Sequence, residues 1–210
     1  MFGRLWQTDT ELESPPVIHI GESMGTPARS ADPMRGWIQL YDGDQAWPLD
    51  LERGSSITIE NIAHALAMKV RFTGHCTEQY SIAQHSVHVC ELVPDEDKPE
   101  GLMHDAAEFV LPDVASPIKA ELPGFKALEH RTEQGIARRF NLRHPWPKSI
   151  KIADNGMVLF ERSKIMNPPK RPEMVWTVPG EPAFIPNFEV WSWKKAEYEF
   201  LAMAYKLGIR

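Results

Sequence analysis

The 210-residue sequence has few cysteines, no long apolar run and no excess of basic residues. Its two cysteines, Cys76 and Cys90, fit neither a disulfide framework nor the spacing of a cysteine-based zinc site. No stretch approaches the roughly 20 apolar residues that cross a bilayer, and the first residues lack the apolar segment of a signal peptide. We therefore expect a cytoplasmic protein that is not held at a membrane.

The charge balance indicates which kinds of ligand the protein can bind. Acidic residues outnumber basic ones, 29 to 23, which gives a net charge of −6. Proteins that coat nucleic acid are normally basic, so a nucleic-acid polymer is not expected as the partner. A single nucleotide remains compatible with this charge, because a few local cations or a metal ion suffice to bind it. Apolar residues make up 42% of the chain, which is enough for the core of one domain.

The sequence divides into three segments. Residues 1–34 mix proline, serine, glycine and acidic residues without periodicity, which predicts a leader that is partly disordered or surface-bound. Residues 35–166 carry the apolar periodicity of the main domain. Residues 167–210 begin with many prolines and end in a helical pattern, so we expect a wrap and a C-terminal helix of the same domain.

The periodicity predicts a mainly α fold, a compact helical bundle with a short N-terminal β-hairpin. The hairpin is expected around an Asp-Gly-Asp turn at residues 42–44. Helices are expected over about 58–70, 81–92, 102–109, 125–140, 148–165 and 193–207. The third of these is apolar on nearly every side, so its few polar residues should lie in or against the core.

Polar residues occupy inward positions on three of the expected helices. His85 lies on the apolar stripe of the second helix, and Asp154 lies in register with the apolar residues of the fifth. On the third, His104 and Asp105 precede Glu108 by four and three residues, so the three side chains can lean to one side. Buried ionisable groups are costly unless they are paired or bound to metal. Two imidazoles and two carboxylates suit a first-row divalent ion.

Each of these residues also has an interpretation without a metal. A lone histidine on an apolar face is more often a hydrogen-bonded core residue than a ligand. Asp154 could pair with Lys151, and Glu108 could be a solvated helix end. The metal interpretation gains weight from the order His, His-Asp, Asp on successive apolar helices, since the His104-Asp105 pair alone is common.

The sequence resembles the HD-domain phosphohydrolases over roughly residues 36–165. The match lies in the His, His-Asp, Asp order and in the stretches AHALAMKVRFTGH, YSIAQHSV, HDAAEFVLPDVASPIK and KIADNGMVLFE. It is closest to the small branch that contains bacterial 5′-deoxynucleotidases and phage-encoded dATP triphosphohydrolases. In the deoxynucleotidases an Arg-Trp pair precedes the first ligand histidine, and here Arg71-Phe72 stands at that place.

The resemblance implies a role for each matching residue. The metal ligands would be His85, His104, Asp105 and Asp154. Glu108 and Asp113 would be catalytic, the first activating the attacking water and the second positioning it or the leaving group. Arg71, Phe72 and Lys119 would bind the substrate. From the residues alone, the two cations would be read as surface charges and the phenylalanine as a core ring.

The function implied is that of a metal-dependent deoxynucleotide phosphohydrolase. The expected cofactor is a divalent cation (Mn, Co, Zn, Fe or Mg), and relatives of this kind form homo-oligomers. The leader, the proline-rich wrap and Arg71-Phe72 favour the phage-like branch, hence a dATP triphosphohydrolase in the cytoplasm, or the host cytoplasm if phage-encoded. Alternatives are a 5′-deoxynucleotidase acting on deoxynucleoside monophosphates, a (p)ppGpp-type hydrolase and a non-catalytic nucleotide-sensing module.

Overall fold

Helices form nearly all of the regular structure in the described residues, which are 36–53, 55–171, 173–174 and 176–210. The structure is a computed structural model, and in it Met34–Arg210 is one compact unit. The expected leader, residues 1–34, lies outside the described residues. Among the described residues, no helix combines the length and the apolar character needed to cross a membrane.

A small hairpin precedes the helices. Strands β1 (Ile38–Gln39) and β2 (Gln45–Ala46) pair antiparallel, with Ile38 opposite Ala46. The turn between them contains Gly43 at φ +90°, a conformation that glycine adopts without steric cost. The predicted hairpin is therefore confirmed.

Seven α-helices and three short 3₁₀ turns follow in the described chain. The helices are α1 (Ile59–Met68), α2 (Ile82–Leu92), α3 (Lys98–Met103), α4 (Ser116–Ala120), α5 (Pro123–Arg139), α6 (Lys148–Ile165) and α7 (Trp193–Lys206). The 3₁₀ turns are η1 (Phe72–Gly74), η2 (Asp95–Asp97) and η3 (Ala106–Phe109). The mainly α fold is confirmed. The hydroxyl of Thr58 caps α1 by accepting a hydrogen bond from the Asn61 N–H.

The prediction of a third helix over residues 102–109 is wrong in its bounds. Helix α3 begins earlier, at Lys98, and ends at Met103. His104 and Asp105 form a turn, after which the chain continues as η3. The imidazole of His104 donates from Nδ1 to the carbonyl of Gly101, an acceptor that a continuing α-helix would use for its own backbone. Helix α4 was not predicted; Pro117 in its first turn suits a helix start.

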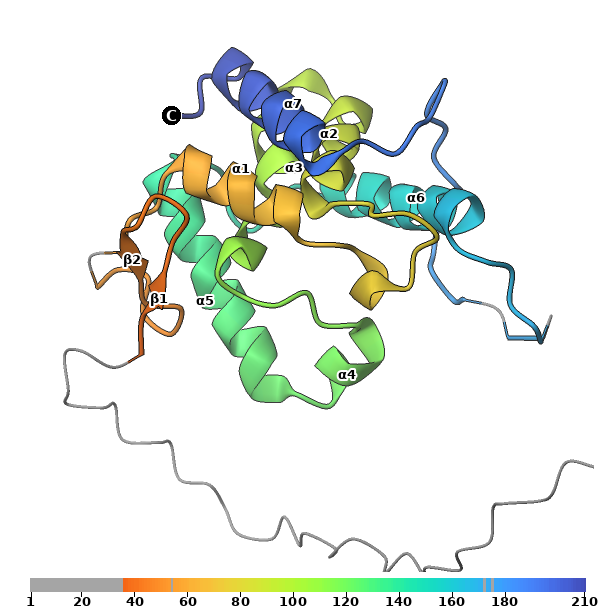
Figure 1. Cartoon of the computed structure of the whole chain (residues 1–210), viewed down its shortest axis with the longest axis horizontal. Coiled ribbons are helices and arrows are strands. Elements are labelled where there is room, and N and C mark those ends of the chain that lie inside the picture. The colour runs from red at the N-terminus through yellow and green to blue at the C-terminus, as the bar shows by residue number, and fades with distance from the viewer. Residues whose placement is uncertain (1–35, 54, 172, 175) are drawn as a thin grey trace, which may run out of the picture. The chain divides into compact units, whose positions relative to one another are not determined.

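Helix α2 lies at the centre of the bundle. It packs against α1, α3, α6 and α7, as Figure 1 shows, and nine of its 11 residues are buried. One apolar cluster joins α1, α2, α3, η3, α7 and the hairpin. A second joins α2 to α6, with Ile185 and Phe188 of the proline-rich wrap packed against it. Because α2 is surrounded, a polar side chain on it, such as that of His85, has to find its partners inside the protein.

We expect Gly101→Ala to destabilise the fold. A Cβ there would lie 2.9 Å from Val93 Cγ2 and 3.2 Å from the Cα of Cys90, because α3 packs closely on α2. Overpacking of this kind costs about 1–3 kcal/mol. The matched control is Gly124→Ala in α5, where a Cβ meets nothing within 4 Å. Urea unfolding measures both, and equal stability of the two variants would contradict the close α2–α3 contact.

Candidate metal centre

The imidazoles of His85 and His104 meet inside the bundle, with ring centroids 5.3 Å apart. His85 is fully buried on α2, and His104 is 8% exposed in the turn after α3. His85 Nδ1 lies 2.6 Å from Glu161 Oε1, and His104 Nδ1 lies 2.9 Å from the Gly101 carbonyl. Each Nδ1 therefore carries the proton, and each Nε2 is left to act as a ligand. Both Nε2 atoms are buried without a hydrogen-bond partner in the described part of the chain.

Two carboxylates complete this cluster. Asp105 Oδ1 lies 3.3 Å from His104 Nε2, and its Oδ2 lies 3.7 Å from His85 Nε2. Asp154 Oδ1, from α6, lies 3.4 Å from His85 Nε2. Ligand atoms bound about 2.1 Å from one metal ion are themselves roughly 3–4 Å apart. One ligand atom each from His85, His104 and Asp105 lies within 4.8 Å of the others, so these three residues could hold a divalent cation, and Asp154 adds a carboxylate oxygen beside His85.

Asp154 fits both interpretations from the sequence, as a partner of Lys151 and as a candidate metal ligand. Its Oδ2 pairs with Lys151 Nζ at 2.9 Å on the surface side, while Oδ1 faces His85. Burial raises the pKa of this carboxyl, but the nearby His85 outweighs burial and holds the pKa well below its usual range. Asp154 therefore offers an ionised oxygen to the cluster.

In the chain without a cation, the carboxylates favour a proton on His85. Burial and the Arg71 guanidinium lower the pKa of His85, whereas Glu161 and Asp154 raise it, and the balance is a pKa of about 9. A divalent cation bound to Nε2 would replace that proton and meet the same negative charges.

Glu108 lies on η3, beyond the turn that ends α3, so it does not share a helix with His104 as the sequence had predicted. Its Oε2 is buried without a hydrogen-bond partner among the described residues. Burial, then the charges of Asp105 and Asp113, raise its pKa to about 9. Burial also raises the pKa of Asp113. The amine of Lys69 fixes this stretch by donating to the backbone carbonyls of Glu108 and Leu111.

Arg71 is part of the cluster and is not the solvated cation that its sequence position alone suggested. Its Nη1 lies 3.4 Å from Asp105 Oδ2, and its Nε lies 3.1 Å from Glu161 Oε2. Phe72 beside it has φ +54°, a strained conformation for this residue. Its half-buried ring lies 5.4 Å from the guanidinium and 5.9 Å from the ring of Trp176 in the wrap. The wrap thus reaches the edge of the cluster.

Lys119 makes its ion pair with a residue outside the four proposed metal ligands. Its amine forms an ion pair with Glu129 of α5 at 2.6 Å. Burial lowers its pKa, but Glu129, and after it Glu108 and Asp105, raise it above the usual range. The lysine therefore acts on the cluster through its charge.

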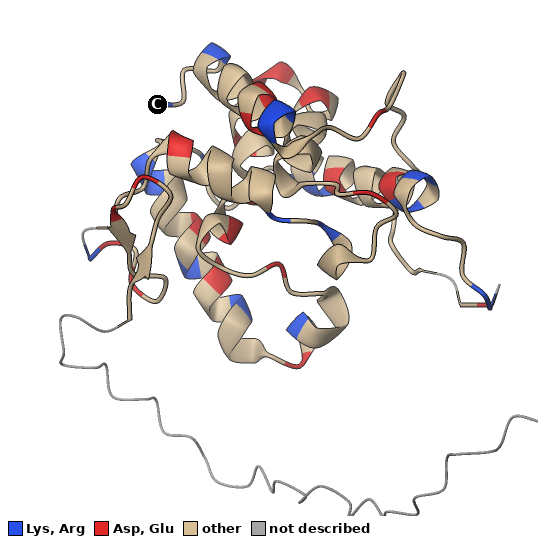
Figure 2. Ribbon diagram, in the orientation of Figure 1, with Lys and Arg blue, Asp and Glu red and all other residues tan. Residues whose placement is uncertain are grey.

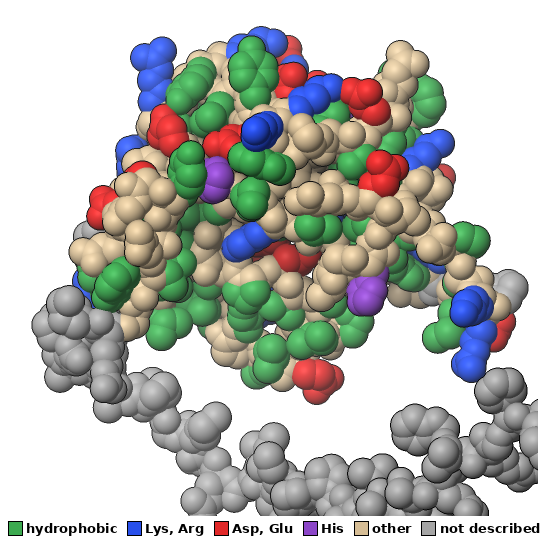
Figure 3. Space-filling view, in the orientation of Figure 1, with side chains coloured by type: hydrophobic (Ala, Val, Ile, Leu, Met, Phe, Trp, Pro, Cys, Tyr) green, Lys and Arg blue, Asp and Glu red, His purple; other side chains and the backbone are tan. Residues whose placement is uncertain are grey.

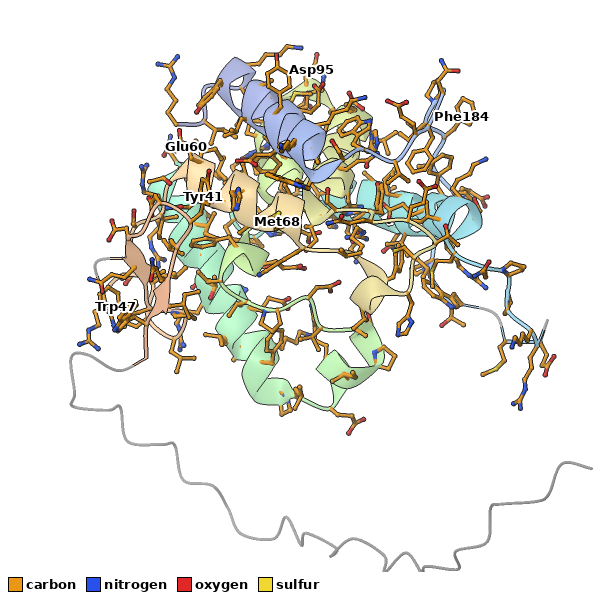
Figure 4. All side chains as sticks on the ribbon, viewed as in Figure 1. Tyr41, Trp47, Glu60, Met68, Asp95 and Phe184 are labelled. Carbon is orange, nitrogen blue, oxygen red and sulfur yellow. The ribbon has the colours of Figure 1, made fainter. Side chains whose placement is uncertain are left out.

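Charged side chains of both signs face one another around this site. In Figure 2 the basic segment after α1 and the acidic segment between η3 and α4 lie on the same face. Figure 3 shows acidic side chains set back from the surface there, beside basic and hydrophobic ones. Met68, at the end of α1, is labelled above this region in Figure 4 and is 48% exposed.

Sequence reasoning missed Glu161, the most connected carboxylate of the site. It is fully buried on α6, and its Oε1 accepts from His85 Nδ1 and, at 2.8 Å, from the hydroxyl of Tyr80. Its Oε2 accepts from Arg71. Burial raises its pKa, but Arg71 and His85 lower it below the usual range. The available signal was its spacing, since Glu161 follows Asp154 by two helical turns and shares its face.

No family model matches the chain. It is 39% identical over 126 residues to the uncharacterized protein YfdR of Escherichia coli K12, a match that covers 60% of this chain and 70% of YfdR. The chain belongs to the YfdR family. It is also 33% identical over 145 residues to an uncharacterized protein of Rhodobacter capsulatus, covering 62% of this chain and 74% of that protein.

Replacing Glu161 with Gln should weaken binding of a divalent ion by about 10–100-fold, the usual effect of losing a carboxylate that orients a metal-bound histidine. The matched control is Glu197→Gln, which removes a carboxylate 3.3 Å from His64 Nδ1 elsewhere in the bundle. Titration with Mn²⁺ or Co²⁺ measures the dissociation constants. Unchanged affinity in a folded Glu161→Gln protein would contradict the positioning role.

The raised pKa of Glu108 predicts a pH-dependent stability in metal-free protein. Between the ordinary value of 4.5 and about 9, the folded chain keeps a proton that the unfolded chain releases. Stability therefore falls as the pH rises through this window. Glu108→Gln should be more stable than wild type in chelator at about pH 8, with the difference vanishing below about pH 4.5. A constant difference across urea titrations at several pH values would contradict the assignment.

Proposed function

We propose that this YfdR-family protein is a metal-dependent phosphohydrolase of the HD type. The observation that carries the proposal is that two buried imidazole nitrogens, those of His85 and His104, face two carboxylates and have no hydrogen-bond partner among the described residues. Buried polar atoms without partners are rare in folded proteins, and a cation would satisfy both nitrogens at once. The mainly helical fold and the order of the four residues along the chain agree with the HD resemblance.

The surrounding side chains supply the other parts of a hydrolytic site. A bound divalent ion would lower the pKa of a water molecule and withdraw charge from a phosphoryl group. A bound cation would favour the ionised form of Glu108. Its Oε2, which has no hydrogen-bond partner among the described residues, would then take the proton of the attacking water, and Asp113 would share that role. Arg71, held by Glu161 and Asp105, keeps a positive charge where the phosphoryl oxygens gain negative charge.

A deoxynucleotide is the substrate class that we propose. The Phe72 ring lies beside the Arg71 guanidinium and contacts the Trp176 ring, which gives an aromatic surface next to a cation and suits a base joined to a phosphate. Within this class we propose deoxynucleoside triphosphates, dATP first, with release of triphosphate. Deoxynucleoside 5′-monophosphates are the alternative, and a homo-oligomer stays a prediction. The complete set of ligands together with Glu108 argues against a non-catalytic sensing module.

A product assay tests this function. Purified protein is incubated with deoxynucleoside triphosphates, deoxynucleoside monophosphates, ribonucleotides and (p)ppGpp, each with Mn²⁺, Co²⁺, Zn²⁺, Fe²⁺ or Mg²⁺. We expect deoxynucleoside and triphosphate from dATP. Orthophosphate released from the monophosphates would favour the 5′-deoxynucleotidase. Absence of hydrolysis with every substrate and metal would contradict the proposal.

Asp105→Ala should abolish turnover and metal binding at the centre formed by His85 and His104, because Asp105 faces both imidazoles and the Arg71 guanidinium. The matched control is Asp95→Ala, which removes an aspartate whose side chain is 91% exposed and pairs with Lys98. Turnover and metal content are measured together on folded protein. Normal activity in the Asp105→Ala protein would contradict the metal assignment.

A further inference from the structure

A second group of ligand-type side chains lies apart from the first. His130 and Glu133 belong to α5, and His144 lies in the segment between α5 and α6. One ligand atom from each of the three lies within 4.8 Å of the others. His144 Nε2 is 3.3 Å from Glu133 Oε2, and His130 Nδ1 is 4.0 Å from the same oxygen. None of the four ligands of the first centre belongs to α5, so the two groups are separate.

The two imidazoles already present the right nitrogen atoms. The amide nitrogen of Gln134, one turn further along α5, lies 3.0 Å from His130 Nε2, and His130 Nδ1 faces Glu133. The ring of His144 meets the ring of Trp146 edge-on, with centroids 4.9 Å apart, and its side chain is 9% exposed. The Trp146 contact fixes the His144 ring. When His130 Nδ1 binds metal its Nε2 carries the proton, and the Gln134 amide would rotate so that its oxygen accepts from that nitrogen.

Electrostatics favour a cation at this place. Glu129 and Glu133 are one turn apart on α5, so their negative charges add. Burial raises the pKa of Glu133 and the hydrogen bond of His144 lowers it, while Glu129 raises it further, and the net direction is upward. Glu129 itself pairs with Lys119, which leaves Glu133 as the carboxylate that faces the two imidazoles. A divalent cation would relieve the repulsion between the two glutamates.

We propose that His130, Glu133 and His144 form a second divalent-metal site, with zinc as the preferred ion. Two imidazoles and one carboxylate are a frequent ligand set for Zn²⁺, with water in the fourth position. An ion there would connect α5 to the segment that leads into α6, the helix that carries Asp154 and Glu161. The role proposed is to clamp these elements together. This second metal site does not depend on the proposed phosphate hydrolysis.

Zinc binding is tested in a chain whose first centre is removed. Asp105→Ala protein should still bind about one Zn²⁺ per chain by isothermal titration, and adding His144→Ala or Glu133→Gln should weaken this binding by about tenfold or more. The matched control adds His75→Ala, which removes an exposed histidine in the residue after η1. That control should bind zinc as the Asp105→Ala protein does.

Circular dichroism and the unfolding temperature complete the test. Circular dichroism checks that each variant is folded, and if Asp105→Ala protein is not, wild type is compared directly with Glu133→Gln, which should bind one Zn²⁺ fewer. Zinc should also raise the unfolding temperature of Asp105→Ala protein but not that of its Glu133→Gln derivative. The proposal of a second site would be overturned if the Asp105→Ala protein bound no zinc. It would also be overturned if adding His144→Ala or Glu133→Gln left the zinc affinity of that protein unchanged. Turnover is not read, so failure of the proposed hydrolysis would leave this result unchanged.

Discussion

The structure depends on a balance of charge inside an apolar bundle. Three carboxylates, those of Asp105, Asp154 and Glu161, meet two imidazoles, while Arg71 is the cation that contacts two of the three. Unpaired charges in a protein interior are expensive, so the cluster needs further positive charge. In the chain alone, a proton on His85 supplies it. A divalent cation would supply more and would also satisfy the unpartnered Nε2 atoms.

The same balance explains local features of the fold. The helix ends at Met103 because the His104 ring takes the carbonyl of Gly101, which turns His104 and Asp105 toward α2. Gly101 lacks a side chain where α3 meets α2, so the turn can lie this close to His85. On the other side, Glu161 links the histidine to Arg71 and Tyr80, so that α2, α6 and the segment after α1 are held by one carboxylate. Packing and electrostatics therefore position the same atoms.

Periodicity and capping predicted the hairpin and most helices, because amphipathic spacing is a local property. The bounds of α3 were not predictable in this way: the residues around His104 are apolar enough to continue a helix, and its end is set by a contact between a side chain and the backbone. Helix α4 was missed because it is five residues long and has no buried residue. Neither feature leaves a clear periodic signal.

The candidate site was likewise predictable in part from the sequence. The four predicted ligands lie together, since inward polar residues on adjacent apolar helices must share the interior. Glu161 was missed because a glutamate near the end of a helix usually faces solvent, and its burial depends on Arg71 and Tyr80, which are distant in sequence. The substrate roles of Phe72 and Lys119 stay predictions.

The most direct test of the central claim is the position of a bound ion in crystals of the full chain grown with Mn²⁺ or Zn²⁺, located by anomalous scattering. We expect an anomalous peak between His85 Nε2 and His104 Nε2, within about 2.3 Å of both nitrogens and of one oxygen each from Asp105 and Asp154. A map with no peak there, and with Asp105 and Asp154 paired only to protein cations, would contradict it.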